Sequence, residues 1–510
     1  MDKANVLFIM TDQQRYDTIA ALGNSLIHTP NLNRLVKRGL SFTKAYSTCP
    51  VCMPARYVVH TGCEPETIGI FQNGPPEEKI PGLPDGIMQR SGPYLPMAMK
   101  SIGYRTFGIG KFHTNPCFEK LGYETHLHSE DLYDIPEQKE GDAYEKFIKA
   151  EHPEFAFIEQ LHGERTDMYY IPQMSPLPAE LTVEAWAACE AVKQINIEDE
   201  RPYFGFVSFL GPHPPFAPPI PYNRMYNPDK MPNPVNGDIK TDHMDEQIPY
   251  MNHLVWAEEI NNSQARILKA RYYGEISYID ACIGKILDAV EASENSDNTL
   301  ICFFSDHGDH MGDHHAWQKE SFFEASCRIP FLLSWPARIP AGQTRDNLIS
   351  LADLFGIATS AGGASEMRDG INLLGVIEGR LQGREYITGM HGTPGSSQFK
   401  IMLRDKRWKY IYMANGGFEQ LFDIEDDPHE LRNLAMVAPS VIIKMKTLAA
   451  ASCNVPGAKK ALDGKGVLKS FAFAVRGKTR IHQFDCSIQR ISYPKNPADA
   501  LQSQIYIKAK

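Results

Sequence analysis

Three apolar runs along the chain have the length and composition of buried β-strands. They cover residues 6–10, 204–210 and 299–304, are rich in β-branched or aromatic residues, and are each followed by polar residues. Apolar residues at helical spacing over 276–290 predict a helix just before the third run. Apolar runs that alternate with helical patterns predict an α/β fold built around a large, mixed, mainly parallel sheet.

The pattern changes towards the end of the chain. A stretch rich in Gly, Pro and Ser at 392–397 predicts a boundary, and residues 399–403 and 408–413 beyond it are predicted strands of an antiparallel sheet. With 510 residues, the chain is longer than one hydrophobic core usually organises. We therefore expect a large domain over 1–392 and a smaller C-terminal α+β domain over 393–510.

Two long segments show no clear period. Residues 212–234 are rich in proline and predict a long ordered loop, which in compact domains often has a functional role. Residues 130–167 are charged and aromatic, and we interpret them as an insertion near the mouth of a substrate site. A short helix is expected after Pro54, through residues 55–59.

Composition excludes several classes of protein. The chain is 43% hydrophobic and 22% charged with a net charge of −10, which argues against binding to nucleic acid. Its ten scattered cysteines are too few for a disulfide scaffold and are expected to be mostly buried thiols. No apolar stretch has the length of a membrane span or the form of a signal peptide. We expect no membrane partner and a cytoplasmic location, or a periplasmic or secreted one if a leader has been removed.

Acidic residues follow two of the predicted strands. Asp12 and Gln13 come after the first run, and Asp306 and His307 after the third. Because ligands of open α/β sheets bind beyond the carboxyl ends of strands, these side chains are candidates to hold one divalent cation. Oxygen ligands favour calcium or magnesium, and the His307 nitrogen leaves manganese open. The alternative is that Asp12 is a helix cap and that Asp306-His307 forms an ordinary turn.

Basic residues elsewhere are candidates to bind an anion and move protons. Lys111 and His113 flank Phe112, so in extended backbone their side chains share one face. His213 follows the second apolar run among prolines that restrict its backbone. Lys319 stands in a Trp-Gln-Lys-Glu segment. Taken singly, each is equally well explained as a surface lysine or a turn histidine.

A Cys-x-Pro-x-Arg pentapeptide spans Cys52 to Arg56. Its cysteine also forms a Cys-x-x-Cys pair with Cys49, which would suggest redox chemistry, but the prolines and Arg56 favour a different use of Cys52. A further group, His310, His314 and His315 near two aspartates, lacks the spacing of a zinc site, and we interpret it as a polar loop rimming the site.

As an ordered set, these motifs resemble the type I, formylglycine-dependent sulfatases of the alkaline phosphatase superfamily. In that family the cysteine of the pentapeptide is oxidised to an aldehyde. The resemblance covers roughly residues 1–435, and the last 75 or so residues match nothing. The matching segments, in the family's order, are 5–12, 28–32, 52–56 with 61–62, 110–113, 212–216, 305–308, 317–330 and 421–434.

The resemblance implies a fold, cofactors and roles for individual residues. It implies an alkaline-phosphatase-like sandwich whose domain 1–392 is catalytic, one divalent metal ion (calcium first, magnesium or manganese as alternatives), and formylglycine made from Cys52 by a maturation enzyme. Many sulfatases have Asp in place of Gln13 and Asn in place of His307, which leaves the metal less certain. The implied metal ligands are Asp12, Gln13, Cys52, Asp306 and His307. The implied catalytic residues are Cys52, Arg56, Lys111, His113, His213 and Lys319.

The implied reaction is hydrolysis of an organic sulfate ester. One hydroxyl of the aldehyde hydrate attacks sulfur, with Asp306 as a proton acceptor and His213 as the acid for the leaving alcohol. His113 then deprotonates the second hydroxyl, and sulfate leaves. The expected substrate is a small sulfated saccharide. The alternatives are a phosphonate monoester or phosphodiester hydrolase of the same superfamily, which shares the Asp-Gln and Asp-His pairs, and a binding protein that has lost the chemistry.

Substrate choice and assembly are left open by the sequence. Specificity residues are expected in 62–96, 130–167 and 221–252, and an oligomer is possible. The unmatched tail, 452–510, would pack on the C-terminal sheet, close over the pocket or mediate a dimer. We expect its basic residues to lie on a solvated surface; the alternative is a place near a polyanionic substrate. They are Arg476, Lys478, Arg480 and His482.

Overall fold

The computed structural model describes residues 3–76, 79–130, 136–155, 158, 161, 169–364 and 366–477. Its centre is a nine-stranded mixed sheet with the order β4-β3-β5-β1-β6-β8-β2-β7, in which β9 also pairs with β2. The pairs from β4 across to β6 are parallel, as is β2 with β9, whereas β7 and β8 run antiparallel to their neighbours. The strands are β1 (Asn5–Thr11), β2 (Leu40–Tyr46), β3 (Arg105–Gly110), β4 (Thr125–His128), β5 (Tyr203–Ser208), β6 (Thr299–Ser305), β7 (Arg328–Ile329), β8 (Phe331–Ser334) and β9 (Gln343–Ser350).

The three apolar runs form strands, as predicted, and the structure places them side by side in the middle of the sheet as β5, β1 and β6. Phe8 of β1 lies opposite Phe206 of β5 and Cys302 of β6. Alternate residues of β1 enter two different cores, because successive side chains of a strand point to opposite faces. Phe8 belongs to one core and Leu7 to the other, and both side chains are fully buried. Burial on both faces explains why these strands are continuously apolar.

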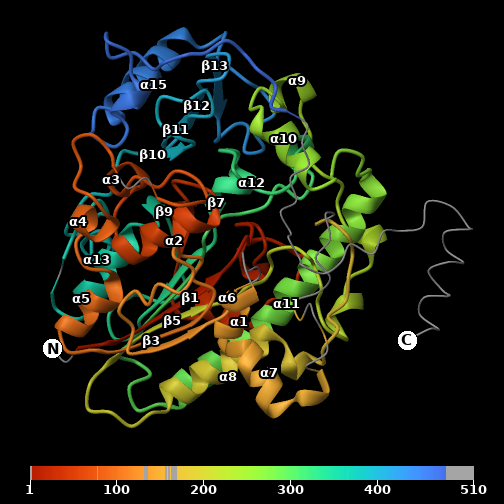
Figure 1. Ribbon diagram of the computed structural model, residues 1–510, viewed down its shortest axis with the longest axis vertical. Helices are drawn as coiled ribbons and strands as arrows, with labels where there is room; N and C mark the ends of the chain where they lie inside the picture. The colour runs from red at the N-terminus through yellow and green to blue at the C-terminus, as the bar shows by residue number, and fades with distance from the viewer. Residues whose placement is uncertain are drawn as a thin grey trace, which may run out of the picture.

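Helices cover both faces of the sheet (Figure 1). Helices α2, α5 and α13 supply the first core, and α1, α8 and α11 the second. The predicted helix over 276–290 is the second half of the 31-residue α11, which begins with a capping box between Asn261 and Gln264. These six helices are α1 (Pro30–Arg38), α2 (Cys52–Thr61), α5 (Leu95–Ser101), α8 (Val183–Ile195), α11 (Asn262–Ala292) and α13 (Asp353–Ala361).

The remaining helices are mostly short and lie in the connections. None of the described helices is long and apolar enough to cross a bilayer. They are α3 (Pro65–Ile68), α4 (Ile87–Ser91), α6 (Pro136–Gly141), α7 (Ala143–Glu151), α9 (Ile239–Asp242), α10 (Gln247–Leu254), α12 (Glu324–Cys327), α14 (Leu373–Ile377) and α15 (Pro439–Ser452).

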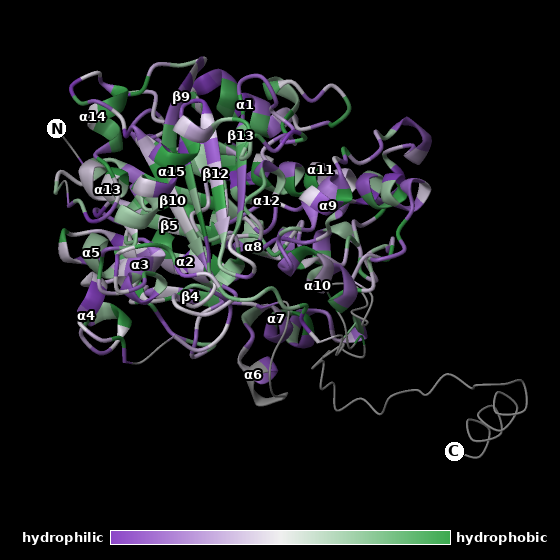
Figure 2. Ribbon diagram, turned by 90° about the horizontal axis from the view of Figure 1, so that it is seen from above, coloured by the Kyte–Doolittle hydropathy of each residue, from purple (hydrophilic) through white to green (hydrophobic). Residues whose placement is uncertain are grey.

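A second, four-stranded antiparallel sheet has the order β10-β11-β12-β13. The predicted strands at 399–403 and 408–413 correspond to β11 and β12, and α15 packs with them around a separate core. The predicted boundary falls between β10 and β11, so β10 lies on its N-terminal side; the division into two domains stays a prediction. Viewed from above, green hydrophobic residues gather along the strands in the middle of the molecule (Figure 2). The strands are β10 (Tyr386–His391), β11 (Lys400–Asp405), β12 (Trp408–Met413) and β13 (Phe418–Asp423).

A buried ion cluster ties the second sheet to the first. Lys409 of β12 has no exposed side-chain surface, and its Nζ lies 2.9 Å from Glu324 Oε1 of α12 and 2.9 Å from Glu430 Oε1. Burial alone would lower the pKa of Lys409, but Cys327, Glu324 and Glu430 raise it well above its ordinary value. The ammonium therefore stays charged between its two carboxylates.

We predict that Lys409→Met will destabilise the protein by about 3–5 kcal/mol, because it leaves buried carboxylates without a counter-ion. Chemical denaturation followed by far-UV circular dichroism measures the change. Lys444→Met is the matched control, since Lys444 is largely exposed and 3.6 Å from Asp405. An equal, small effect of both substitutions would contradict the role of Lys409.

Candidate functional site

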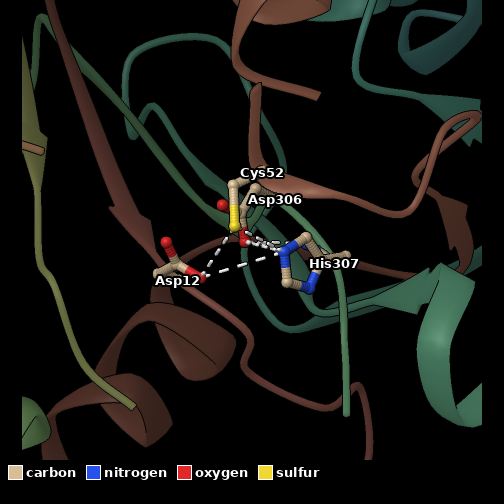
Figure 3. Close-up of side chains that lie close together, drawn as sticks. All are labelled: Asp12, Cys52, Asp306 and His307. Atoms are coloured by element: carbon tan, nitrogen blue, oxygen red, sulfur yellow. Dashed lines mark hydrogen bonds and ion pairs between the residues drawn. The ribbon is translucent and has the colours of Figure 1, made fainter. Parts of the chain in front are cut away.

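The predicted site residues meet at the carboxyl ends of the central strands. Asp12 directly follows β1, Asp306 and His307 directly follow β6, and Cys52 is the first residue of α2. One ligand atom from each of these four buried residues lies within 4.8 Å of the others. Figure 3 shows the four side chains converging on a common point. The topology therefore brings together groups that are up to 295 positions apart in sequence.

Each member of this group is held so that one ligand atom faces its partners. His307 Nδ1 lies 3.0 Å from the Gly308 carbonyl, which can only accept, so Nδ1 carries the hydrogen. The other ring nitrogen, Nε2, lies 3.2 Å from Cys52 Sγ and 3.8 Å from Asp12 Oδ1. The Oδ1 atom of Asp306 accepts backbone N–H bonds from Gln13 at 3.0 Å and His307 at 2.9 Å. Fixed orientation of this kind is typical of metal-ligating side chains.

Gln13 completes the oxygen-rich side of the site. Its amide nitrogen donates to Asp309 Oδ2 and, at 3.3 Å, to Gln318 Oε1. The amide oxygen is thereby turned the other way, where it accepts from Lys319 Nζ at 3.0 Å. Tyr170 donates to the same Asp309 oxygen at 2.6 Å, so the carboxylate is itself fixed. Gln13 therefore presents an oxygen, the atom type that a hard cation prefers.

Two cations pair with these acidic groups. The Arg56 guanidinium lies 2.9 Å from Asp12 Oδ2 and 3.1 Å from Asp306 Oδ2. Lys111 Nζ lies 2.8 Å from Asp12 Oδ2. Both basic side chains are almost fully buried, which excludes the alternative that Lys111 is a surface lysine. Since Asp12 Oδ2 is used by both cations, its Oδ1 remains for the shared ligand position.

Electrostatics keep Asp12 and Cys52 in their charged forms. Burial would raise the pKa of Asp12, but Lys111, His213 and Arg56 bring it well below its ordinary value. Burial and Asp12 would raise the pKa of the Cys52 thiol, but Lys319 and His307 bring it well below its ordinary value. Lys319 Nζ lies 2.9 Å from Cys52 Sγ. Cys52 is also the first residue of α2, and the N-terminus of a helix favours negative charge.

Cys49 does not behave as the partner of a redox pair. Both cysteines are free, and the Cys49 thiol donates to the Phe71 carbonyl at 3.4 Å. Burial and Glu320 raise the pKa of Cys49 well above its ordinary value, so it is a buried neutral thiol. The two cysteines thus sit in opposite electrostatic environments, which disfavours the redox alternative.

The histidines at 113 and 213 lie beside the cluster. His113 has a left-handed backbone, with φ 49°, so the Lys-Phe-His segment is not extended as the alternation assumed. Its Nδ1 is buried and has no hydrogen-bond partner among the residues that the structure describes. His213 Nδ1 lies 2.8 Å from the Pro214 carbonyl, and its charge acts on Asp12. No measured contact joins either ring to Cys52 in the described part of the chain.

Several positioning residues were not singled out from the sequence. Glu130 Oε1 accepts from the backbone of Phe112 at 3.1 Å and from His128 Nε2 at 2.6 Å, and so fixes the loop after β3. Glu130 is the first residue of the predicted insertion 130–167, part of which lies outside the described residues. Asp309 had been placed in a polar loop at the rim, but it is fully buried behind Gln13. Only these three-dimensional contacts identify such residues, because their spacing carries no motif.

The residues present fit a divalent cation. Two carboxylates, a thiol position and an imidazole nitrogen converge. The Gln13 amide oxygen is joined to the thiol position through Lys319, and hydrogen bonds orient the side chains of Gln13, Asp306 and His307. Asp306 Oδ2 has no hydrogen-bond partner among the described residues other than its ion pair with Arg56. Such a donor set suits calcium, magnesium or manganese.

We predict that Asp309→Asn will weaken metal binding roughly 10–100-fold, as losses of outer-shell partners of metal ligands do. The new amide would set one NH₂ group against another and turn the Gln13 oxygen away. Calorimetric titration of the metal-free protein measures this. Asp288→Asn on exposed α11 surface is the control, and equal affinity of both variants would refute the orienting role of Asp309.

Comparison with known proteins agrees with this geometry. The family model described as Sulfatase matches residues 4–363, and that described as N-sulphoglucosamine sulphohydrolase, C-terminal, matches residues 312–448. An arylsulfatase of Clostridium perfringens is 29% identical over 447 residues, covering 85% of this chain and 90% of its own.

Solved structures with the same fold include a phosphonate monoester hydrolase of Agrobacterium radiobacter. Its TM-score is 0.72 at 24% identity, with 90% of this chain and 96% of that chain covered. A second is the structure titled BT4656 in complex with its substrate D-glucosamine-2-N,6-O-disulfate, with a TM-score of 0.67 at 18% identity and coverage of 90% and 100%. The chain therefore belongs to the sulfatase family of hydrolases and has its alkaline-phosphatase-like fold.

Proposed function

We propose that this sulfatase cleaves its ester with a formylglycine made from Cys52. The observation that carries the proposal is the position of the Cys52 side chain. Its sulfur lies 3.2 Å from His307 Nε2, one of the candidate metal ligands, and 2.9 Å from Lys319 Nζ on the other side. A nucleophile at this place would be close both to a metal and to the charge of a bound sulfate.

The proposed reaction needs two groups beyond the coded side chains: an aldehyde at residue 52 and a divalent metal ion. The coded thiol stands where the aldehyde would be, and an aldehyde hydrate would supply two hydroxyls on one carbon, one to attack sulfur and one whose deprotonation releases inorganic sulfate. A divalent ion held by Asp12, Gln13, Asp306, His307 and residue 52 would supply Lewis acidity that lowers the pKa of a bound hydroxyl.

Lys111 and Lys319 are the proposed binders of sulfate oxygens. Their ammonium groups approach the site from two sides, one at Asp12 and the other at Cys52 and Gln13. Both are buried, so their charges act through little water and are worth more than at the surface. Arg56 holds Asp12 and Asp306 in place and is proposed to orient the aldehyde hydrate.

The proposed proton transfers use groups around this charged centre. As the sulfur–oxygen bond of the ester breaks, His213 gives its proton to the leaving alcohol oxygen. Asp306 is the proposed acceptor of the proton from the attacking hydroxyl, and His113 of the proton from the second hydroxyl. The availability of His113 for such a transfer is supported by its buried Nδ1, which neither accepts nor donates a hydrogen bond within the described portion of the chain.

The proposed substrate is a sulfated saccharide. The support is a structural relative that has a sulfated glucosamine as its substrate. The alternative, a phosphonate monoester or phosphodiester hydrolase, is supported by the fold of the Agrobacterium enzyme and by Gln13 and His307 at the metal site. The lysine at 111 and the histidine at 113 favour sulfate.

We predict that protein co-produced with a formylglycine-generating enzyme will release sulfate from sulfate monoesters faster than it cleaves phosphonate monoesters or phosphodiesters. Matched 4-nitrophenyl esters measure the ratio. A ratio in favour of the phosphorus esters would replace the sulfatase assignment of this site with the alternative.

Lys319→Ala should lower kcat by about 10²–10³, the loss typical of one charge-stabilising donor. The exposed Lys285 on α11 provides the control, and Lys285→Ala should leave turnover unchanged. Near-normal turnover of Lys319→Ala would remove Lys319 from the mechanism.

A further inference from the structure

A second polar cluster adjoins the catalytic group on the side of the C-terminal sheet. We call it the rim cluster and define it by Gln247, Tyr250, Glu320, His391 and Arg476. Glu320 follows the catalytic Lys319 directly, and its backbone N–H donates to the Pro50 carbonyl at 3.0 Å, close to Cys52. The rim cluster therefore begins one residue from the sulfate site.

Hydrogen bonds connect the cluster from Glu320 outwards to Arg476. The Gln247 amide donates its N–H to the Glu320 carboxylate and accepts from the Arg476 guanidinium. The backbone N–H of Arg476 donates to Glu246. One α10 amide thus links the catalytic loop to the last described part of the chain.

The Arg476 guanidinium is held by an aromatic ring and the Gln247 amide, whereas the backbone N–H of Arg476 donates to Glu246. Its guanidinium carbon lies 3.6 Å from the centroid of the Tyr250 ring, a stacked cation–π arrangement. Among the described residues, no carboxylate lies within ion-pair distance of this guanidinium. The side chain is only partly buried, so an incoming ligand has access to it. A stacked, unpaired guanidinium is preorganised to bind a carboxylate or a sulfate through two parallel hydrogen bonds.

His391, the last residue of β10, gives an independent sign of a ligand position. Its side chain is 95% buried, since 5% remains exposed, and neither ring nitrogen has a hydrogen-bond partner in the described portion of the chain. Its Nε2 lies 3.6 Å from Glu320 Oε2, too far for a good hydrogen bond. An unsatisfied buried imidazole is costly, and a polar substrate group would satisfy it.

The negative charge nearby is limited. Burial raises the pKa of Glu320, although Lys400 and Lys319 act against it. Asp245 is paired with Lys400. Burial also raises the pKa of Glu246, although Arg476 lowers it. Glu320 is the one acidic member of the rim cluster, and together with its neighbours Asp245 and Glu246 it therefore repels an anion less than three free carboxylates would.

We propose that Arg476 and His391 form a second anion subsite, so that the substrate is a saccharide bearing another negative group besides the sulfate that is cleaved. This inference rests on the proposed function, because it extends that same site. The second group is a carboxylate or a second sulfate, both of which match the guanidinium. Arg476 had been counted with a solvated surface, and its stacking on Tyr250 argues for this different role. Lys478, Arg480 and His482 lie outside the described residues.

The test compares sugars that differ in one charge. Methyl glucosides carrying one sulfate at O2, O3 or O4 are matched with counterparts in which C6 is a carboxylate or bears a second sulfate. Calorimetry on the chain with the coded thiol at position 52 measures binding without turnover. Sulfate release by the matured protein is measured separately, so a failure of the chemistry is distinguishable from a failure of this subsite.

At least one dianionic sugar should bind more tightly than its monoanionic match, and Arg476→Gln should weaken that dianion roughly tenfold more than the monoanion, as loss of a charge-assisted pair does. Arg476→Lys should retain part of the preference. Arg266→Gln is the matched control, because Arg266 also donates to an amide oxygen, that of Asn233 at 2.8 Å, and is partly buried.

Several results would overturn the subsite. One is equal binding of monoanions and dianions by the native chain. Another is an equal loss of both in Arg476→Gln together with a lower Tm, which would show that Arg476 only anchors the chain. The carboxylate and disulfate arms decide which second group the subsite prefers.

Discussion

The site depends on two buried carboxylates and the cations that compensate them. Asp12 and Asp306 are fully buried at the ends of neighbouring strands, where an uncompensated charge would cost several kcal/mol. Arg56 spans both, at 2.9 and 3.1 Å, and Lys111 adds a third contact at 2.8 Å. With these pairs formed, one oxygen of Asp12 and the side chain of residue 52 are left facing a common point. The same contacts that make burial tolerable therefore orient the candidate metal ligands.

The fold supplies this geometry through strand order. Because β5, β1 and β6 are adjacent and parallel, their following loops converge at one edge, and α2 enters that edge with residue 52 at its N-terminus. The C-terminal sheet closes the same region from another side. Met390, which precedes His391 in β10, donates its backbone N–H to Thr48 at 2.8 Å, just before the Cys49–Arg56 segment. The second sheet thus helps to build the mouth of the site.

Much of this arrangement was predictable from local pattern, and some was not. The central strands, the long α11 and the strands β11 and β12 follow from apolar periodicity, which depends on nearby residues only. The assembly of Asp12, Cys52, Asp306 and His307 followed from ordered motifs. Asp309 and Gln318 were missed because their contacts with Gln13 cross about 300 positions of sequence, and Glu130 because its nearby contacts with Phe112 and His128 belong to no motif. The left-handed backbone of His113 was not predicted either, because the alternation of Lys111, Phe112 and His113 was interpreted as extended backbone.

The proposed chemistry requires residue 52 to act as an aldehyde rather than a thiol. The most direct measurement is the mass of the peptide that spans Cys52, on protein co-produced with a formylglycine-generating enzyme, with a known sulfatase treated in parallel. We expect conversion of the cysteine to formylglycine at this position. An unmodified thiol at position 52, together with full conversion of the parallel sulfatase, would contradict it and would favour a protein that keeps the fold without this chemistry.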